Sequence, residues 1–167
     1  MTRAPHPVDA AAALLSAYAA SARINQYLLE HLPARVWRMA PPDGGRTIAA
    51  LVAHLHNCGL RYLARTDRRG VPAELDRHRV TQAQAARALG AKGRAVVRIA
   101  GAALRTGARI VGFTGDAAHF LAYYMAHDAH HRGQIVLLAR QLGAPIDQDT
   151  MIGMWQWPRR ARELPAS

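Results

Sequence analysis

The sequence predicts an all-α protein, a four-helix up-down bundle with a short C-terminal tail packed on it. Alanine, the strongest helix former, accounts for 35 of the 167 residues, whereas only ten residues are aromatic. Apolar residues recur at three- and four-residue spacing in four long segments, which glycine- and proline-rich stretches separate. The sequence contains no alternating run with a hairpin turn and no internal repeat. The length suits one domain, so we assign residues 1–167 to a single helical bundle.

The first two helical segments have recognisable ends. The first is predicted over residues 8–31, with Asp9 near its start, where it suits the helix dipole, and Pro33 just past its end. A loop rich in proline and glycine follows. The second segment, residues 47–66, starts at Thr47, which is a suitable N-cap.

The third and fourth segments are predicted over residues 81–104 and 114–142. Thr81 and Gln84 fit a capping box at the start of the third segment. Three glycines inside that segment lower its intrinsic helix stability, so it is the least strongly marked of the four. Gly143 is placed to stop the fourth helix.

The C-terminal tail, residues 144–167, follows the last predicted helix. It begins with Pro145 close behind the helix end, and it contains Trp155 and Trp157. We expect these tryptophans to pack a short tail segment back onto the bundle.

The charge balance is strongly basic. Twenty-two basic residues face 11 acidic ones, the formal net charge is +11, and residues 77–115 contain no acidic residue. This charge makes nucleic-acid binding, non-specific and salt-sensitive, one alternative function. The arginines are dispersed, however, and Phe113 is the only aromatic residue in the acid-free stretch, which also lacks a known nucleic-acid-reading motif. A GC-rich coding sequence explains the same arginine and alanine bias equally well.

Several classes of protein are excluded by the sequence. A single cysteine, Cys58, cannot form an internal disulfide or a cysteine-based zinc site. No apolar stretch approaches the ~18–20 residues of a membrane-spanning helix, which predicts no membrane partner. The first seven residues are not followed by the apolar region of a signal peptide. We therefore expect a soluble, cytoplasmic protein.

Nine histidines are present, and two of them are spaced to act together. His127 and His131 are four residues apart, so on a helix they differ by ~40° and ~6 Å and project from one face. Two histidines of this spacing on an apolar face can coordinate one metal ion together. A third ligand must then come from a neighbouring helix. His54 and His56 are both available on the second segment, and periodicity does not choose between them. The alternative is a pair of core histidines with hydrogen-bond partners.

Residues 127–135, His-Asp-Ala-His-His-Arg-Gly-Gln-Ile, closely resemble the HxxxHRGQ signature of the DinB/YfiT-like family. Residues 140–143 resemble the continuation of that signature. Residues 48–55 are similar to the family's second-helix ligand segment, and residues 25–30 are similar to its first-helix motif. The resemblance spans three of the four predicted helices.

This resemblance implies a bundle of the DinB/YfiT-like type that holds a divalent metal ion with three histidines. Carried over by position, the ligands are His54, His127 and His131, which selects His54 over His56. Family members are often dimers, so a homodimer is expected. Characterised relatives include transferases and isomerases that use bacillithiol, mycothiol or glutathione, and a low-molecular-weight thiol is therefore an expected partner of the small-molecule substrate.

Three neutral imidazoles leave a bound metal ion with its full charge and with open coordination positions. Such an ion lowers the pKa of a bound water or thiol, which is the activation that a thiol-dependent transferase, isomerase or hydrolase needs. Zinc is the expected ion, and nickel, iron and manganese also accept imidazole ligands. A non-catalytic metal-binding stress protein is the alternative to this metal-dependent enzyme.

No catalytic residue is assigned by the sequence, but three candidates stand out. Gln134 lies one turn beyond the second histidine of the pair and can orient a ligand or a substrate. Tyr62 lies eight residues after His54 and is a candidate proton donor, with an ordinary core tyrosine as the alternative. Asn25 is a candidate through the resemblance alone.

Two further residues near the expected site are assigned structural roles. Helical geometry directs Arg132 away from the histidine pair, which favours a salt bridge or a capping role. Cys58 lies one turn beyond His54 and is interpreted as a small buried apolar residue.

Overall fold

The computed structural model describes residues 9–163, and within this range it contains helices and no strand. The all-α prediction is therefore confirmed. None of the described helices is long and apolar enough to cross a membrane. The elements in chain order are α1 (Ala10–His31), the 3-10 turn η1 (Ala34–Val36), α2 (Ile48–Asn57), α3 (Leu60–Thr66), α4 (Gln82–Thr106), α5 (Ala117–Gln141), α6 (Gln148–Met154) and α7 (Trp157–Glu163).

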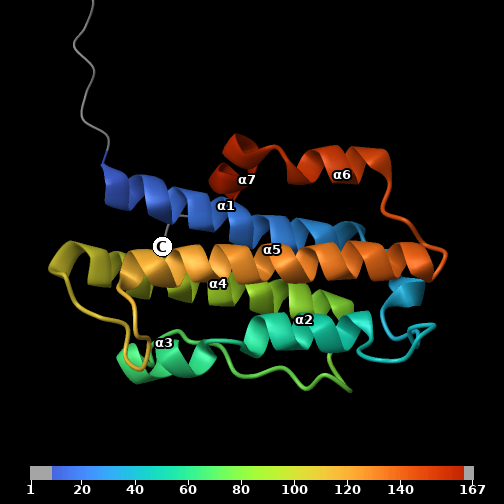
Figure 1. Cartoon of the computed structure of the whole chain (residues 1–167), viewed down its shortest axis with the longest axis horizontal. Helices are drawn as coiled ribbons and strands as arrows, with labels where there is room; N and C mark the ends of the chain where they lie inside the picture. Colours follow the sequence, from blue (N-terminus) through green and yellow to red (C-terminus); the bar gives the residue numbers. More distant parts are fainter. Residues whose placement is uncertain (1–8, 164–167) are drawn as a thin grey trace, which may run out of the picture.

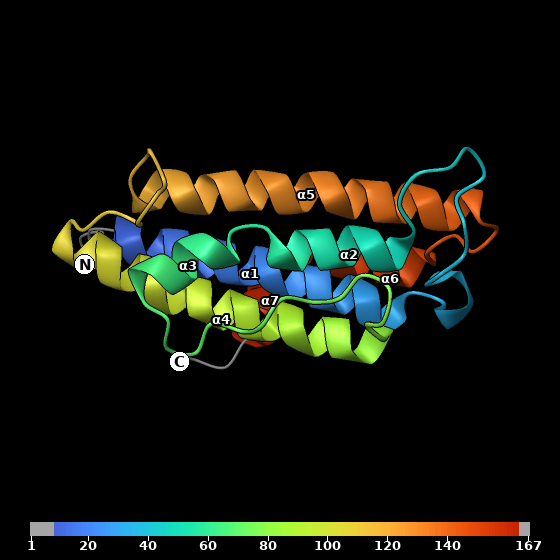
Figure 2. The same cartoon turned by 90° about the horizontal axis from the view of Figure 1, so that it is seen from below.

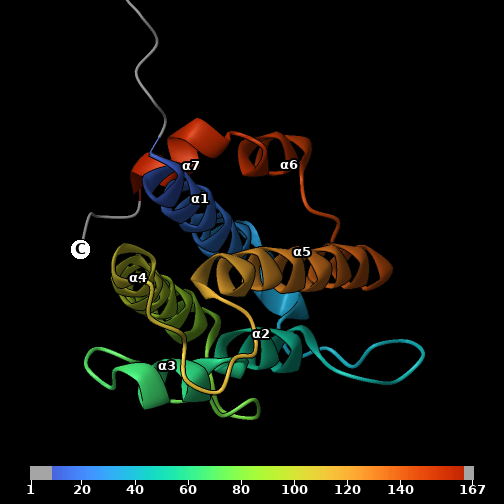
Figure 3. The ribbon, with the colours of Figure 1, turned by 60° about the vertical axis from the view of Figure 1, so that its left-hand side comes forward.

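The helical bundle surrounds an apolar core, with α6 and α7 on the outside beside α1 (Figure 3). α1 and α5 run in one direction, and α2 and α4 run in the other (Figures 1 and 2). The connector between α3 and α4 returns along the bundle. The side-chain amide of Asn57 anchors it, because it donates a hydrogen bond to the Leu75 carbonyl and accepts one from the Leu75 N–H. Strict up-down alternation therefore does not extend to α4, because this long connector brings the chain back before the helix starts.

The predicted caps are present at the helix ends. Asp9 and Thr47 accept hydrogen bonds from the backbone of the first turns of α1 and α2. Thr81 and Gln84 form the capping box of α4, which is unbroken despite its glycines. A side chain at Gly90 would place its Cβ 2.4 Å from Nε2 of a glutamine on α1, so this glycine permits close packing of α1 and α4.

The prediction of one continuous helix over residues 47–66 was wrong. α2 ends at Asn57, and α3 begins at Leu60 after Gly59 adopts a left-handed conformation with φ of +82°. A Cβ at Gly59 would lie 1.5 Å from the hydroxyl oxygen of Tyr124 on α5. The tyrosine therefore occupies the space that a side chain at position 59 would need, and only glycine meets both requirements.

A replacement of Gly59 by alanine is expected to lower the free energy of unfolding by about 3 kcal/mol. The left-handed backbone accounts for about 1–2 kcal/mol of this cost, and the collision with Tyr124 adds a further 1–3 kcal/mol. Gly107→Ala is the matched control, because Gly107 is also left-handed but has no atom within 4 Å of the new Cβ. Urea unfolding of both variants measures the difference, and equal losses would contradict the packing requirement.

Lys92, the one lysine of the chain, caps the C-terminal end of α2. Lys92 of α4 is 2% exposed, donates a hydrogen bond to the Leu55 carbonyl at 2.6 Å, and lies 4.9 Å from the centre of the Tyr124 ring. Burial lowers the pKa of Lys92, whereas the charge of Asp128 opposes that shift. Lys92 therefore satisfies a carbonyl that the interrupted helix leaves without a backbone partner.

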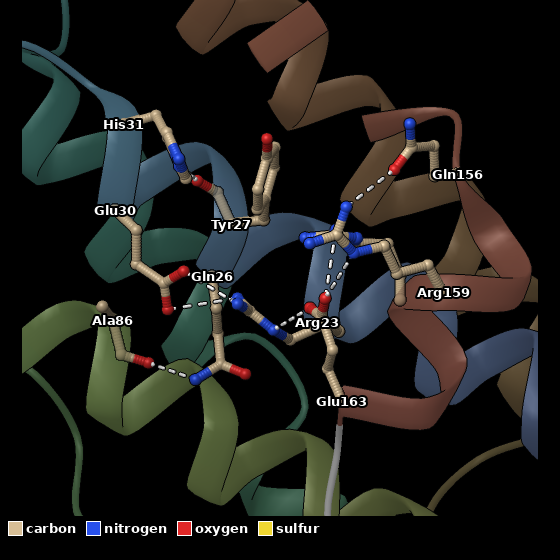
Figure 4. Close-up of polar contacts among 10 residues, drawn as sticks. Arg23, Gln26, Tyr27, Glu30, His31, Ala86, Gln156, Arg159 and Glu163 are labelled. Atoms are coloured by element: carbon tan, nitrogen blue, oxygen red, sulfur yellow. Dashed lines mark hydrogen bonds and ion pairs between the residues drawn. The ribbon is translucent and has the colours of Figure 1, made fainter. Parts of the chain in front are cut away.

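The predicted packing of the tail onto the bundle is confirmed, with one correction. Figure 4 shows Arg23 of α1 paired with Glu163 of α7, at 2.9 Å, and Arg159 reaching the same carboxylate. Trp157 packs against the core as a partly buried residue. Trp155, however, which follows the last residue of α6, is 75% exposed and is not part of the packed core.

Candidate metal centre

Three histidines from two helices meet inside the bundle. His54 comes from α2, and His127 and His131 come from α5, and one ligand nitrogen of each lies within 4.8 Å of the other two. The ring centres are 4.5 Å apart for His127 and His131, and 4.8 Å apart for His54 and His131. The four-residue spacing on α5 thus places both rings toward α2, as helical geometry requires.

The two histidines of α2, between which periodicity did not choose, lie in different surroundings. His56 is fully buried, and its Nδ1 lies 2.9 Å from the Oδ1 of Asn57. His54 instead faces α5 and joins the cluster. His130 lies beside His131, with ring centres 5.0 Å apart, but is not part of the group.

Gln134 orients one of the three rings. The Nδ1 of His131 lies 2.7 Å from the Oε1 of Gln134, one turn further along α5. If Nδ1 donates this hydrogen bond, the other nitrogen of His131 is left as a ligand atom. Burial lowers the pKa of both His131 and His54, which keeps their rings in the neutral form that binds metals. For His54, the positive charge of Arg46 adds to this effect.

Asp128 supports the second ring of the α5 pair. Its Oδ1 lies 3.7 Å from the Nδ1 of His127, and both atoms are buried without a hydrogen-bond partner among the described residues. Contacts with Asp128 and Cys58 raise the pKa of His127 to about 9. A carboxylate behind the ring holds it in position and increases its basicity, as in many metal sites.

Asn25 belongs to this supporting layer and not to the ring cluster. Its Nδ2 donates a hydrogen bond of 2.8 Å to Asp128, and its Oδ1 accepts one of 2.8 Å from Arg132. Arg132 also reaches the backbone and side chain of Ser21. Arg132 thus has the structural role that its direction predicted, although it acts through neutral partners and not through a salt bridge. The chain Arg132–Asn25–Asp128 fixes the carboxylate from α1.

Tyr62 and Cys58 both pack against the apolar core. Tyr62 packs edge-on against Phe113, with ring centres 6.2 Å apart, and no contact joins it to the three histidines in the described part of the chain. Tyr123 and Tyr124 are the tyrosines beside the site, with ring centres 6.0 Å and 6.1 Å from that of His127. Cys58 is half-buried and packs against the apolar core, as expected, and its sulfur also lies 3.9 Å from the Tyr124 hydroxyl and close to His127. Contact with His127 lowers the pKa of the Cys58 thiol.

Asp128 and Lys92 are two of the buried polar residues that sequence reasoning did not identify. Asp128 is 3% exposed, and its signal in the sequence is its position directly after His127, which turns it ~100° around α5 toward α1. Lys92 carries a weaker signal, as the one lysine among 22 basic residues.

The three imidazoles fit a divalent metal ion. Nitrogen ligands of one zinc ion lie about 2.0–2.1 Å from it, and hence within about 4 Å of one another. The present spacing is therefore close to that of a bound set, and small rotations of the side chains would complete it.

Comparison with known proteins places the chain in a family. A family model described as the DinB superfamily matches residues 17–135, a range that includes all three histidines. The searches of curated proteins and of solved structures returned no match. The match covers well over half of the chain and agrees with the helical bundle, and the protein therefore belongs to the DinB superfamily.

Proposed function

We propose that the protein is a metal-dependent enzyme that holds one divalent ion, preferentially zinc, between His54, His127 and His131. The convergence of three ligand nitrogens from α2 and α5 is the observation that carries this proposal. The neutral rings of His54 and His131 favour metal binding over protonation. Sites with three histidine ligands keep a coordination position open, which is typical of catalytic and not of structural zinc.

The proposed reaction is the transfer, isomerisation or hydrolysis of a small substrate with the help of a low-molecular-weight thiol. A bound ion would supply the Lewis acidity that brings the pKa of a coordinated thiol or water toward neutrality. The residues of the chain keep the ligands in place. Gln134 fixes His131, and Asp128, held by Asn25, faces His127. The homodimer and the cytoplasmic location stay predictions of the sequence.

Elemental analysis of protein purified without chelator tests the metal centre, and we expect about one divalent ion per chain. Reconstitution with Co²⁺ then tests the open position. Addition of 2-mercaptoethanol is expected to produce a new thiolate-to-cobalt absorption band, whereas 2-methoxyethanol is the control that cannot form one. Transfer assays that combine thiols with electrophilic acceptors separate an enzyme from a metal-binding protein. The proposal would be contradicted if the purified protein held no metal and if added Co²⁺ produced no absorption band of a protein-bound ion.

A further inference from the structure

An open hollow of about 490 Å³ lies beside His131, one of the three clustered histidines. It is bounded by the loop before α2, by the first turn of α2 and by the C-terminal half of α5. His131 and Gln134 form part of its wall, so a molecule bound there lies against the proposed metal centre. The hollow is therefore the natural place for a substrate.

The wall of this hollow has a definite chemical character. Leu51, Leu137 and Leu138 provide apolar surface, Gln141 provides an amide, and His130 provides an imidazole. Among residues 9–163, no acidic residue lines the hollow, and Arg46 is its one arginine. A ligand that matches this wall has a short apolar body and one negative charge.

Arg46 is available to bind such a charge. Its side chain is exposed in the loop directly before α2, and no hydrogen bond or ion pair to its guanidinium is formed within residues 9–163. Two arginines elsewhere in the fold are engaged by contrast, since Arg38 donates to two backbone carbonyls and Arg98 pairs with Asp67. A free guanidinium beside a hollow without acidic groups matches a carboxylate, which it can bind through two parallel hydrogen bonds.

We propose that Arg46 binds a carboxylate of the substrate or thiol whose reacting group lies at His54, His127 and His131. This inference rests on the proposed function and adds the class of ligand, a small carboxylic acid. One guanidinium balances one carboxylate, whereas nothing else on the wall carries a fixed positive charge that a phosphate dianion would require. Arg46 acts here as a specificity-determining residue.

The test compares two probes that differ only in charge, 3-mercaptopropionate and 3-mercaptopropionamide. Their dissociation constants are measured by calorimetry with zinc-loaded protein. Arg46→Gln is the test variant, and Arg65→Gln is the control, because Arg65 is exposed on α3 and lies outside the wall of the hollow. We expect wild type and Arg65→Gln to bind the acid about tenfold more tightly than the amide, and Arg46→Gln to bind the two equally. Equal binding by wild type, or a preference that persists in Arg46→Gln, would overturn the proposal.

A second measurement separates this inference from the metal centre. The same titrations are followed by nuclear magnetic resonance with metal-free protein, through the side-chain amide signals of Gln134 and Gln141, which line the hollow in wild type and variant alike. A preference for the acid that disappears in Arg46→Gln supports the carboxylate site even if the protein binds no zinc, in which case only the proposed function fails. Absence of this preference in the metal-free protein, together with equal binding in the zinc-loaded protein, rejects the carboxylate site and leaves the metal centre unaffected.

Discussion

Replacement of His127 by alanine is expected to remove tight metal binding, with a fall in zinc affinity of about 10²–10³-fold. The reason is that His54 and His131 alone provide two ligands from different helices, and the binding free energy of ~10–16 kcal/mol for a structural zinc ion is shared among its ligands. Competition with a chromophoric chelator measures the affinity. Thermal unfolding gives a second readout, since zinc at 100 times its dissociation constant adds about 2.7 kcal/mol of stability.

His130→Ala is the matched control for this experiment. His130 is an exposed histidine of the same helix, it lies next to His131, and it is not part of the ligand group. Zinc should raise the melting temperature of wild type and of His130→Ala by about 5–10 °C, and that of His127→Ala by much less. Equal zinc affinity in His127→Ala and wild type would exclude the three-histidine centre.

The second large effect is expected at Asp128. Asp128→Asn keeps the size of the side chain but removes the charge behind His127. Measured above pH 9, where no proton on His127 competes with the ion in either protein, metal affinity should fall about 10–100-fold. In the metal-free protein the pKa of His127, raised to about 9 in the wild type by Asp128 and Cys58, should move toward its usual value near 6.5. Because His127 binds a proton below pH 9, zinc affinity of the wild type should increase with pH up to that value.

Asp149→Asn is the control for Asp128→Asn, since Asp149 is exposed on α6 and distant from the histidines. Titration of the histidine ring signals by nuclear magnetic resonance gives the pKa, and chelator competition gives the affinity. A role of Asp128 in packing alone would lower stability and leave both quantities unchanged, so that result would reject its role as a positioning residue.

Local features of the fold were predictable because they depend on neighbours in the chain. Asp9, Thr47 and the Thr81–Gln84 capping box all act at helix starts, as their positions indicated. The pairing of His127 with His131 follows in the same way from the pitch of one helix. These contacts span four residues or fewer, and the tertiary fold hardly alters them.

The helical pattern of the sequence did not predict the end of α2 before Gly59. A glycine within a helical pattern is usually tolerated at a cost of about 1 kcal/mol, so the pattern alone favours a continuous helix. The structure shows that the hydroxyl of Tyr124, 65 positions further along the chain, occupies the space beside Gly59. A long-range contact therefore decides where the helix ends.

By itself, the sequence determined the helical class of the protein, the caps of its helices and the presence of a histidine pair on one face. The residues alone did not choose between His54 and His56, which the resemblance to the family decided and the packing of α2 against α5 explains. The tertiary structure alone decided the direction of α4, the support of His127 by Asp128 and the position of Arg46 beside the site. The physical reason is that helical periodicity specifies angles around one axis, whereas a site requires the relative placement of several axes, which arises from packing between distant segments.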